Sequence, residues 1–139
     1  MSKIPSKHLS KVVNREKKNK GAKFTVRSVK TGKDFTYRIS RSEFKDKWYT
    51  HVEIEKGYLN FQRLGTYNAF KGAITNKGQI VESVAANAIS YVLRQVTKGK
   101  DEWLDTQVDV MHTGACIVCG KELTDAYSIE NGIGPVCSK

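Results

Sequence analysis

Long apolar runs are absent from this sequence of 139 residues. A membrane-spanning helix needs about 18 to 20 consecutive apolar residues, and no stretch of the chain approaches that length. The N-terminus is polar and rich in lysine, and it lacks the apolar stretch of a secretory signal peptide. Both absences argue against a membrane or secreted protein, so we expect a cytoplasmic one.

Cysteine is scarce, and its placement is uneven. The chain has three cysteines, all of them after residue 115. An odd number does not favour a secreted disulfide framework, whereas thiols at short spacing in a reducing compartment more often bind a metal. The sequence also lacks a P-loop, a dinucleotide-binding fingerprint and a nucleophile elbow. We therefore expect a protein that is not an enzyme.

Acidic residues are too few to balance the basic ones. The chain has 14 Asp and Glu against 24 Lys and Arg, which gives a formal net charge of +10. Residues 1–23 carry eight basic residues and one acidic residue, a net charge of +7. We expect residues 1–22 to form a flexible basic arm, which is either a solubilising tail or a contact for a polyanion.

The remaining chain predicts an α+β fold. Alternating apolar and polar residues indicate strands over 24–29, 34–39, 48–54 and 58–64, with a short fifth strand at 66–70 or 73–75. Apolar residues at helical spacing predict one helix over 83–98, with Ser83 as its N-cap and Gly99 after its end. We expect residues 23–105 to form a body in which an antiparallel sheet of about five strands packs on one helix, and residues 106–139 to form a zinc-binding module.

The C-terminal residues have the spacing of a metal site. Cys116 and Cys119, followed by glycine, match the turn of a zinc knuckle, in which two thiolates chelate one ion. A glycine- and proline-containing turn precedes Cys137 and can bring it back to the pair. His112 lies four residues before the first cysteine and can complete a tetrahedron. We predict a closed structural Zn2+ site with His112, Cys116, Cys119 and Cys137 as ligands.

Three other interpretations of these cysteines remain open. They are free buried thiols, a redox pair or the ligands of a catalytic zinc. A redox Cys-x-x-Cys normally opens a helix after a strand in a thioredoxin-like unit, and that context is missing. A nucleoside deaminase site requires a glutamate two residues after the histidine, whereas Gly114 stands at that position after His112.

A longer pattern surrounds the cysteines: Cys-x-x-Cys-Gly-Lys-x-Leu-Thr-x3-Ser-Ile-x-x-Gly-Ile-Gly-Pro-x-Cys over residues 116–137. It resembles a small zinc-binding domain of unassigned function that is found in many bacteriophage-encoded proteins, often with a histidine at the position of His112. Segments 24–26, 31–38 and 64–66 and Trp48 match the companion domain of such proteins more loosely. The resemblance implies a phage origin, a place in the host cell cytoplasm and a zinc-stapled module. It implies no reaction.

Aromatic and basic residues interleave along the predicted strands, as in Lys47-Trp48-Tyr49. On a solvated sheet face, such residues can stack on bases and contact phosphates, although aromatic residues can equally belong to the core. We expect Tyr49, Tyr58 and Tyr67 to be exposed. We hypothesise that the arm and one sheet face bind DNA or RNA. The expected contact residues are Lys11, Arg15, Lys17, Lys18, Lys20, Lys23, Arg38, Tyr49 and Arg63.

Two further hypotheses concern other functions. A protein-binding inhibitor of a host enzyme or of an antiviral defence system is the alternative to nucleic-acid binding, on analogy alone. His51, Glu53 and Glu55 share one strand face and could form an acid–base or metal site. Antiparallel sheets commonly have one polar face, so we expect these three residues to be a solvated surface instead.

Overall fold

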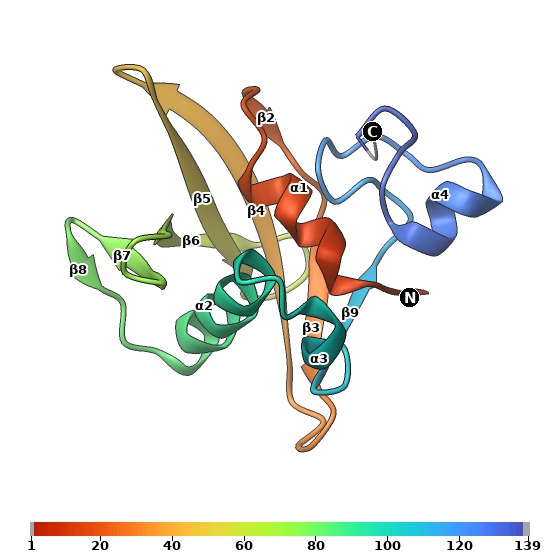
Figure 1. Ribbon diagram of the computed structural model, residues 1–139, viewed down its shortest axis with the longest axis horizontal. Coiled ribbons are helices and arrows are strands. Elements are labelled where there is room, and N and C mark those ends of the chain that lie inside the picture. Colours follow the sequence, from red (N-terminus) through yellow and green to blue (C-terminus); the bar gives the residue numbers. More distant parts are fainter. Residues whose placement is uncertain (1, 138–139) are drawn as a thin grey trace.

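The computed structural model describes residues 2–137, and the strands among them form one antiparallel sheet (Figure 1). Within these residues, eight strands follow the order β1-β9-β3-β4-β5-β6-β7-β8, and β2 pairs with β4 outside that row. The strands are β1 (Ser2–Ile4), β2 (Asn19–Lys20), β3 (Phe24–Ser28), β4 (Asp34–Phe44), β5 (Lys47–Glu55), β6 (Phe61–Asn68), β7 (Ala73–Asn76), β8 (Gln79–Ile80) and β9 (Val108–His112). The helices are the 3-10 turn η1 (Ser6–His8), α1 (Leu9–Val13), α2 (Val84–Thr97), α3 (Asp101–Leu104) and α4 (Ala126–Asn131).

The predicted α+β class with an antiparallel sheet is confirmed, but the sheet is larger than about five strands. Strand β6 continues through Gly65, where the sequence predicts an end. Gly65 has a φ of +154°, and a Cβ there would collide with the Thr75 carbonyl of β7. Glycine at this position therefore allows close pairing of β6 and β7, and the fifth strand is β7.

Helix α2 covers the middle of one sheet face, as the apolar periodicity predicts. The Ser83 hydroxyl accepts a hydrogen bond from the Ala86 N–H at 3.1 Å, which confirms it as the N-cap. The buried Tyr37 hydroxyl donates to the Ala85 carbonyl at 2.6 Å, and the Ile74 N–H donates to the Ser90 hydroxyl at 3.0 Å. These two bonds fix the helix to strands β4 and β7. Each fully buried Leu or Ile on its inner face contributes about 1.5–3 kcal/mol.

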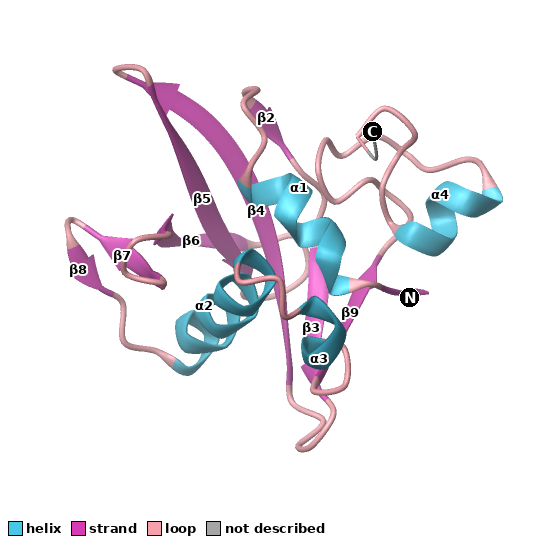
Figure 2. Cartoon of the chain, viewed as in Figure 1, coloured by secondary structure: helices cyan, strands magenta, loops and turns pink. Residues whose placement is uncertain are grey.

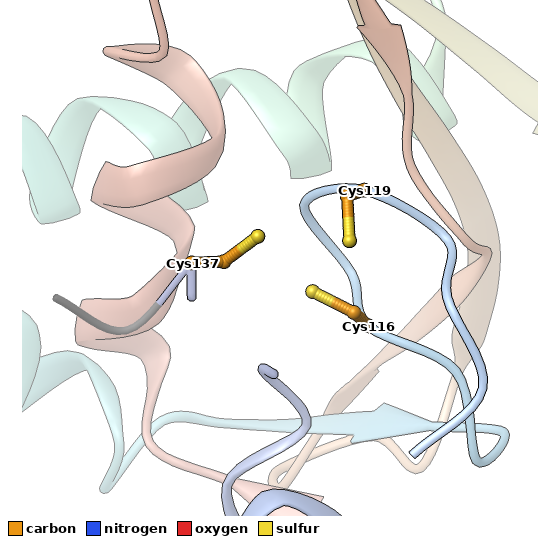
Figure 3. Close-up of side chains that lie close together, drawn as sticks. All are labelled: Cys116, Cys119 and Cys137. Carbon is orange, nitrogen blue, oxygen red and sulfur yellow. The ribbon is translucent and has the colours of Figure 1, made fainter. Parts of the chain in front are cut away.

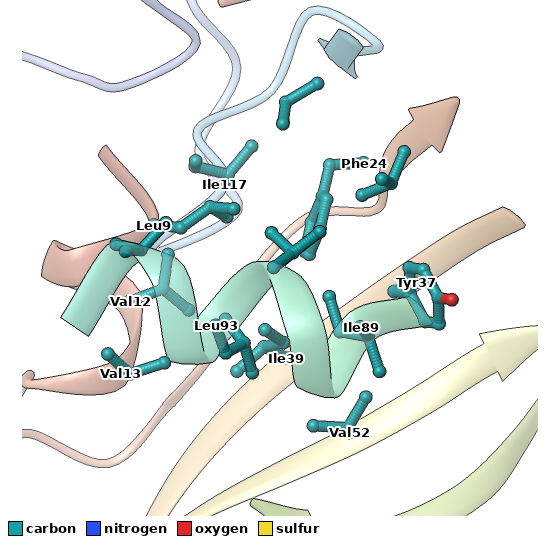
Figure 4. Packing of buried hydrophobic residues seen from close by; sticks show 14 of the residues in the cluster. Leu9, Val12, Val13, Phe24, Tyr37, Ile39, Val52, Ile89, Leu93 and Ile117 are labelled. Atoms are coloured by element: carbon teal, nitrogen blue, oxygen red, sulfur yellow. The ribbon is translucent and has the colours of Figure 1, made fainter. Parts of the chain in front are cut away.

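The structure differs from the expectation of a flexible arm over residues 1–22. Residues 2–22 pack into the fold: β1 pairs with β9, and β2 pairs with β4. The few apolar side chains of this segment explain the difference, because Ile4, Leu9, Val12 and Val13 are all buried in the core. Figure 4 shows the three side chains from α1 next to Leu93 of α2. We call residues 2–22 the N-terminal segment.

The three predicted domains also share one sheet and one core. Strand β9, expected to open the C-terminal module, lies between β1 and β3. Ile117 and Ile133, from the predicted module, belong to the same buried cluster as Leu9 and Ile89. No helix in the described part of the chain is long and apolar enough to cross a membrane.

Candidate metal centre

Three cysteine side chains meet beside α1 and converge on one point (Figure 3). The Sγ atoms of Cys116, Cys119 and Cys137 all lie within 4.8 Å of one another. In a tetrahedral site with Zn–S bonds of about 2.3 Å, two sulfurs stand about 3.8 Å apart. The three thiols are therefore placed to hold a metal ion, and we call them the metal centre. Cys116 is fully buried, and the other two are half-buried.

A tight turn presents the first two thiols. The Gly120 N–H donates to the Cys116 carbonyl at 2.8 Å, and the Cys116 N–H donates to the Lys121 carbonyl at 2.8 Å. Gly120 has a φ of +81°, and a Cβ there would lie 3.1 Å from the Lys20 carbonyl oxygen. The turn is the knuckle that the Cys-x-x-Cys-Gly spacing predicts, and it packs directly on β2.

Helix α4 and the residues after it bring the third thiol, that of Cys137, back beside the knuckle. The Asp125 carboxylate caps α4 by accepting the Ser128 N–H at 3.0 Å. Gly132 ends the helix with a φ of +69°, and a Cβ there would lie 2.9 Å from the Ile4 side chain. The Ile117 N–H then donates to the Gly132 carbonyl at 3.0 Å, which ties this return to the knuckle. Glycine at position 132 thus suits both the left-handed φ and the close packing of the Ile4 side chain.

The surroundings make the three thiols unequal. Burial disfavours the charged form of Cys116, but backbone N–H groups, that of Gly134 first, lower the pKa of its thiol below the usual value. Burial raises the pKa of Cys137 to about 11; Arg15 opposes this rise, and the nearby Cys119 and Cys116 add to it. Three adjacent thiols ionise together only when a cation offsets their mutual repulsion. The chemistry of this set therefore suits a divalent metal.

His112, the predicted fourth ligand, does not lie with the three thiols. Its Nδ1 accepts the Gly114 N–H at 2.9 Å, and its Nε2 donates to the Ile129 carbonyl. The side chain is only 2% exposed. Both ring nitrogens are occupied because His112 sits at the end of β9, under the last turn of α4. In this structure it joins these two elements.

Arg15 reaches the metal centre, a contact that the sequence did not predict. Its Nη1 donates to Cys137 Sγ at 2.9 Å, and its Nε is buried without a hydrogen-bond partner among the described residues. Cys119 and Cys137 also line a hollow of about 390 Å3 together with Arg15 and Lys17. Arg15 and Cys137 lie 122 residues apart, so no local sequence signal could have paired them.

On the sheet face, the predicted basic contact residues have acidic or polar partners. Arg38 bonds both Glu53 carboxylate oxygens at 3.2 and 3.3 Å and lies 3.9 Å from the Phe61 ring centre. Lys23 pairs with Glu55 at 3.1 Å. This part of the sheet face is balanced in charge, which weakens it as a phosphate-binding surface.

The remaining sheet-face residues divide between exposed and buried. Arg63 Nη1 lies 3.0 Å from His51 Nδ1, and burial and then this arginine lower the pKa of His51. Tyr49 is half-buried and Tyr58 is exposed. Tyr67 is buried, so the prediction that it is exposed is wrong. It lies on the core face of β6, which its position in the sequence did not reveal.

The predicted contact residues of the N-terminal segment lie in and after α1. Lys11, Lys17, Lys18 and Lys20 are exposed, and Arg15 is half-buried against Cys137. Lys121, in the knuckle turn, is exposed as well and lines the same hollow as Lys17. The structure therefore brings basic residues from both ends of the chain to the rim of the metal centre.

Comparison with known proteins gives one match, and it covers the metal centre. Residues 108–139 match the model of a family of unknown function (DUF6011). The matched part begins with β9, contains all three cysteines and spans less than a quarter of the chain. No curated protein and no solved structure matches. The chain is thus similar to this family in the part that forms the metal centre.

Proposed function

We propose that this chain is a small accessory protein that binds nucleic acid, and that a structural Zn2+ ion at Cys116, Cys119 and Cys137 holds its contact surface in place. We assign it no catalytic reaction. The resemblance of the C-terminal pattern to phage-encoded proteins supports a role in the cytoplasm of an infected bacterial cell.

The donor set and the local fold support zinc as the ion. Thiolate ligands favour Zn2+ over the hard cations, and a knuckle turn is its usual structural setting. Figure 2 shows that most of the chain after β9 is loop, apart from the short α4. Few apolar side chains hold this part of the chain, among them Ile117, Leu123 and Ile133. Metal binding would supply folding free energy to this part of the chain, where few apolar side chains are buried.

The single observation that carries the nucleic-acid proposal is a group of exposed lysines on the knuckle turn and on the segment that packs against it. We define the lysine surface as Lys17, Lys18, Lys20 and Lys121. None of the four forms an ion pair with an acidic residue in the described part of the chain. Exposed lysines can neutralise the phosphates of a nucleic acid, and the release of the counterions bound to those phosphates favours binding.

The knuckle fixes the position of this surface. The Ala22 N–H donates to the Cys116 carbonyl at 3.3 Å, and the Lys20 carbonyl lies against Gly120. The segment that carries three of the lysines is therefore attached to the turn that carries the fourth. Loss of the metal would release the turn and separate the lysines.

Binding to labelled single-stranded and duplex oligonucleotides over a range of salt concentrations tests the proposal. We expect the logarithm of the binding constant to fall linearly with the logarithm of salt concentration. The variant Lys17→Gln/Lys18→Gln/Lys20→Gln should bind more weakly at every salt concentration. The slope of its salt dependence should be smaller by about 0.7–0.9 for each phosphate that the variant no longer neutralises.

A matched variant, Lys30→Gln/Lys33→Gln/Lys98→Gln, removes the same charge from exposed lysines outside the lysine surface. It should retain most of the affinity. The proposal is wrong if the natural chain binds no DNA or RNA at low salt, or if the matched variant loses as much affinity as the first.

Protein binding is the second candidate function, and one surface feature favours it. A groove of about 600 Å3 between α2 and the β3–β4 hairpin is lined by apolar residues that include Phe35, Val84 and Tyr91. Val84 is 62% exposed at the start of α2. Val84→Glu would place a charge in the groove. It should leave α2 intact, because a carboxylate is favourable near a helix N-terminus. A stoichiometric partner that survives nuclease treatment and no longer binds this variant would favour protein binding.

A further inference from the structure

We infer that Arg15 is a part of the metal centre, and that it makes metal binding and docking of the N-terminal segment depend on each other. The inference rests on the metal-binding part of the proposed function. It does not depend on nucleic-acid binding.

The first observation is the contact between a guanidinium and a ligand sulfur. Arg15 lies in the connection between α1 and β2, and its Nη1 donates to Cys137 Sγ at 2.9 Å. A divalent ion with three thiolates has a net charge of −1. A half-buried guanidinium beside it supplies the opposite charge, and a charged donor–acceptor pair forms a stronger hydrogen bond than a neutral one. Residues that bond metal ligands in this way tune the affinity of the ion.

The second observation is that the sheet holds Arg15 in place. The Arg15 carbonyl accepts a hydrogen bond from Arg41 Nε at 2.7 Å. Arg41 is 8% exposed on β4, and its Nη1 donates to the Thr50 hydroxyl of β5 at 2.7 Å. The main chain at Arg15 is thus anchored to two strands before its side chain meets Cys137. A contact that is positioned in advance costs little entropy when the metal binds.

The third observation is that the rest of the N-terminal segment packs around the same region. Beyond the buried face of α1, His8 Nε2 lies 3.3 Å from Asn131 Oδ1 at the end of α4. Strand β1 pairs with β9, which leads into the knuckle. Arg15 therefore connects a docked segment to a metal ligand. If it raises the affinity for the metal, the metal must stabilise the docked segment by the same factor.

Lys17 provides a control from the same segment. It lies two residues after Arg15 and lines the hollow beside Cys119 and Cys137, but it donates to none of the three sulfurs. A general effect of positive charge near the metal would appear with Lys17 and Arg15 alike. An effect of the N–H to sulfur bond would appear with Arg15 alone.

The affinity for Zn2+ tests the inference, measured by competition with a chromophoric chelator under reducing, oxygen-free conditions. We expect Arg15→Gln to weaken zinc binding about 10- to 100-fold, the usual effect of removing a partner of a metal ligand. Arg15→Lys should fall in between, because lysine keeps the charge but loses the planar donor geometry. Lys17→Gln should bind zinc as the natural chain does.

Hydrogen exchange over residues 9–22 provides a readout of docking, with far-UV circular dichroism as a check that each variant is folded. In the natural chain, chelation should remove protection from these residues. In zinc-loaded Arg15→Gln, protection should already be reduced, and chelation should reduce it less.

The possible outcomes separate the two proposals. If the natural chain binds no zinc, the metal part of the proposed function fails and this inference fails with it. If the natural chain binds zinc but Arg15→Gln matches Lys17→Gln in affinity, Arg15 is not part of the centre. Unchanged protection of residues 9–22 on chelation would likewise overturn the coupling.

Discussion

At the scale of single residues, His112 and Arg15 both have partners other than those that the sequence predicts for them. Histidine four residues before a cysteine has the spacing of a ligand, but spacing does not show which partners the ring nitrogens take. Gly114 and Ile129 occupy both nitrogens of His112. Arg15, expected to contact a phosphate, donates a hydrogen bond to Cys137 Sγ. Both differences depend on tertiary contacts, of His112 with Ile129 and of Arg15 with Cys137, that no local pattern encodes.

The role of His112 can be tested by substitution. We expect His112→Asn to bind one equivalent of Zn2+ and, with Co2+, to retain the absorption of a three-thiolate site. It should lower the free energy of unfolding by about 1–3 kcal/mol, because the Ile129 carbonyl loses its donor and a buried ring is removed. Metal analysis, cobalt spectra and denaturant unfolding measure these effects.

Cys119→Ser serves as the control, because it removes a sulfur from the metal centre and should alter the cobalt spectrum. A folded His112→Asn protein that no longer binds metal would contradict the prediction. It would show that the histidine leaves its two partners and becomes a ligand when the ion binds.

At the scale of elements, sequence patterns identify those that carry their own signal. The alternation of β3 and the periodicity and N-cap of α2 are sufficient to place both to within a residue or two. Strand β4 runs on to Phe44, beyond the predicted end at residue 39, although its last residues are mostly polar. Those residues pair with β5. Among them, the buried Arg41 donates hydrogen bonds to the Thr50 hydroxyl and to the Arg15 carbonyl. Such bonds form only once the partners are assembled.

Short elements carry no such signal. Strands β1 and β2 have three and two residues, and each exists because a longer strand offers an edge. From the sequence alone, the few apolar residues of α1 predict a helix of marginal stability. They suffice because α2 and the residues after β9 complete a core around Leu9 and Val12. The net positive charge of the segment therefore says little about whether it is ordered.

At the scale of the whole molecule, the position of β9 determines how far the effect of the metal extends. Strand β9 lies inside the sheet, between β1 and β3, and leads directly to the knuckle. Ile117 of the knuckle is fully buried in the core that also contains Leu93 of α2. A disturbance at the cysteines thus reaches the centre of the fold. Such connections favour a single cooperative unfolding transition.

We therefore expect removal of zinc to lower the thermal stability of the whole chain in one step. At a free zinc concentration about a thousandfold above the dissociation constant, binding contributes about 4 kcal/mol, which corresponds to about 10–25 °C in Tm for a chain of this size. The loss should shrink as the pH falls, because protons compete with the metal for the thiolates and zinc then binds more weakly and contributes less stability. Calorimetry with and without a chelator, at two pH values, measures both effects.

Two separate transitions, with the one at higher temperature unaffected by the chelator, would contradict this prediction. That result would mean that the body over residues 23–105 folds on its own, and that the N-terminal segment and the metal centre are attached to it as dispensable parts. The sequence suggests such a division into three parts. The pairing of β9 with both β1 and β3 argues against it, because a body without β9 would leave an edge of β3 unpaired and lose the buried Val110 from its core.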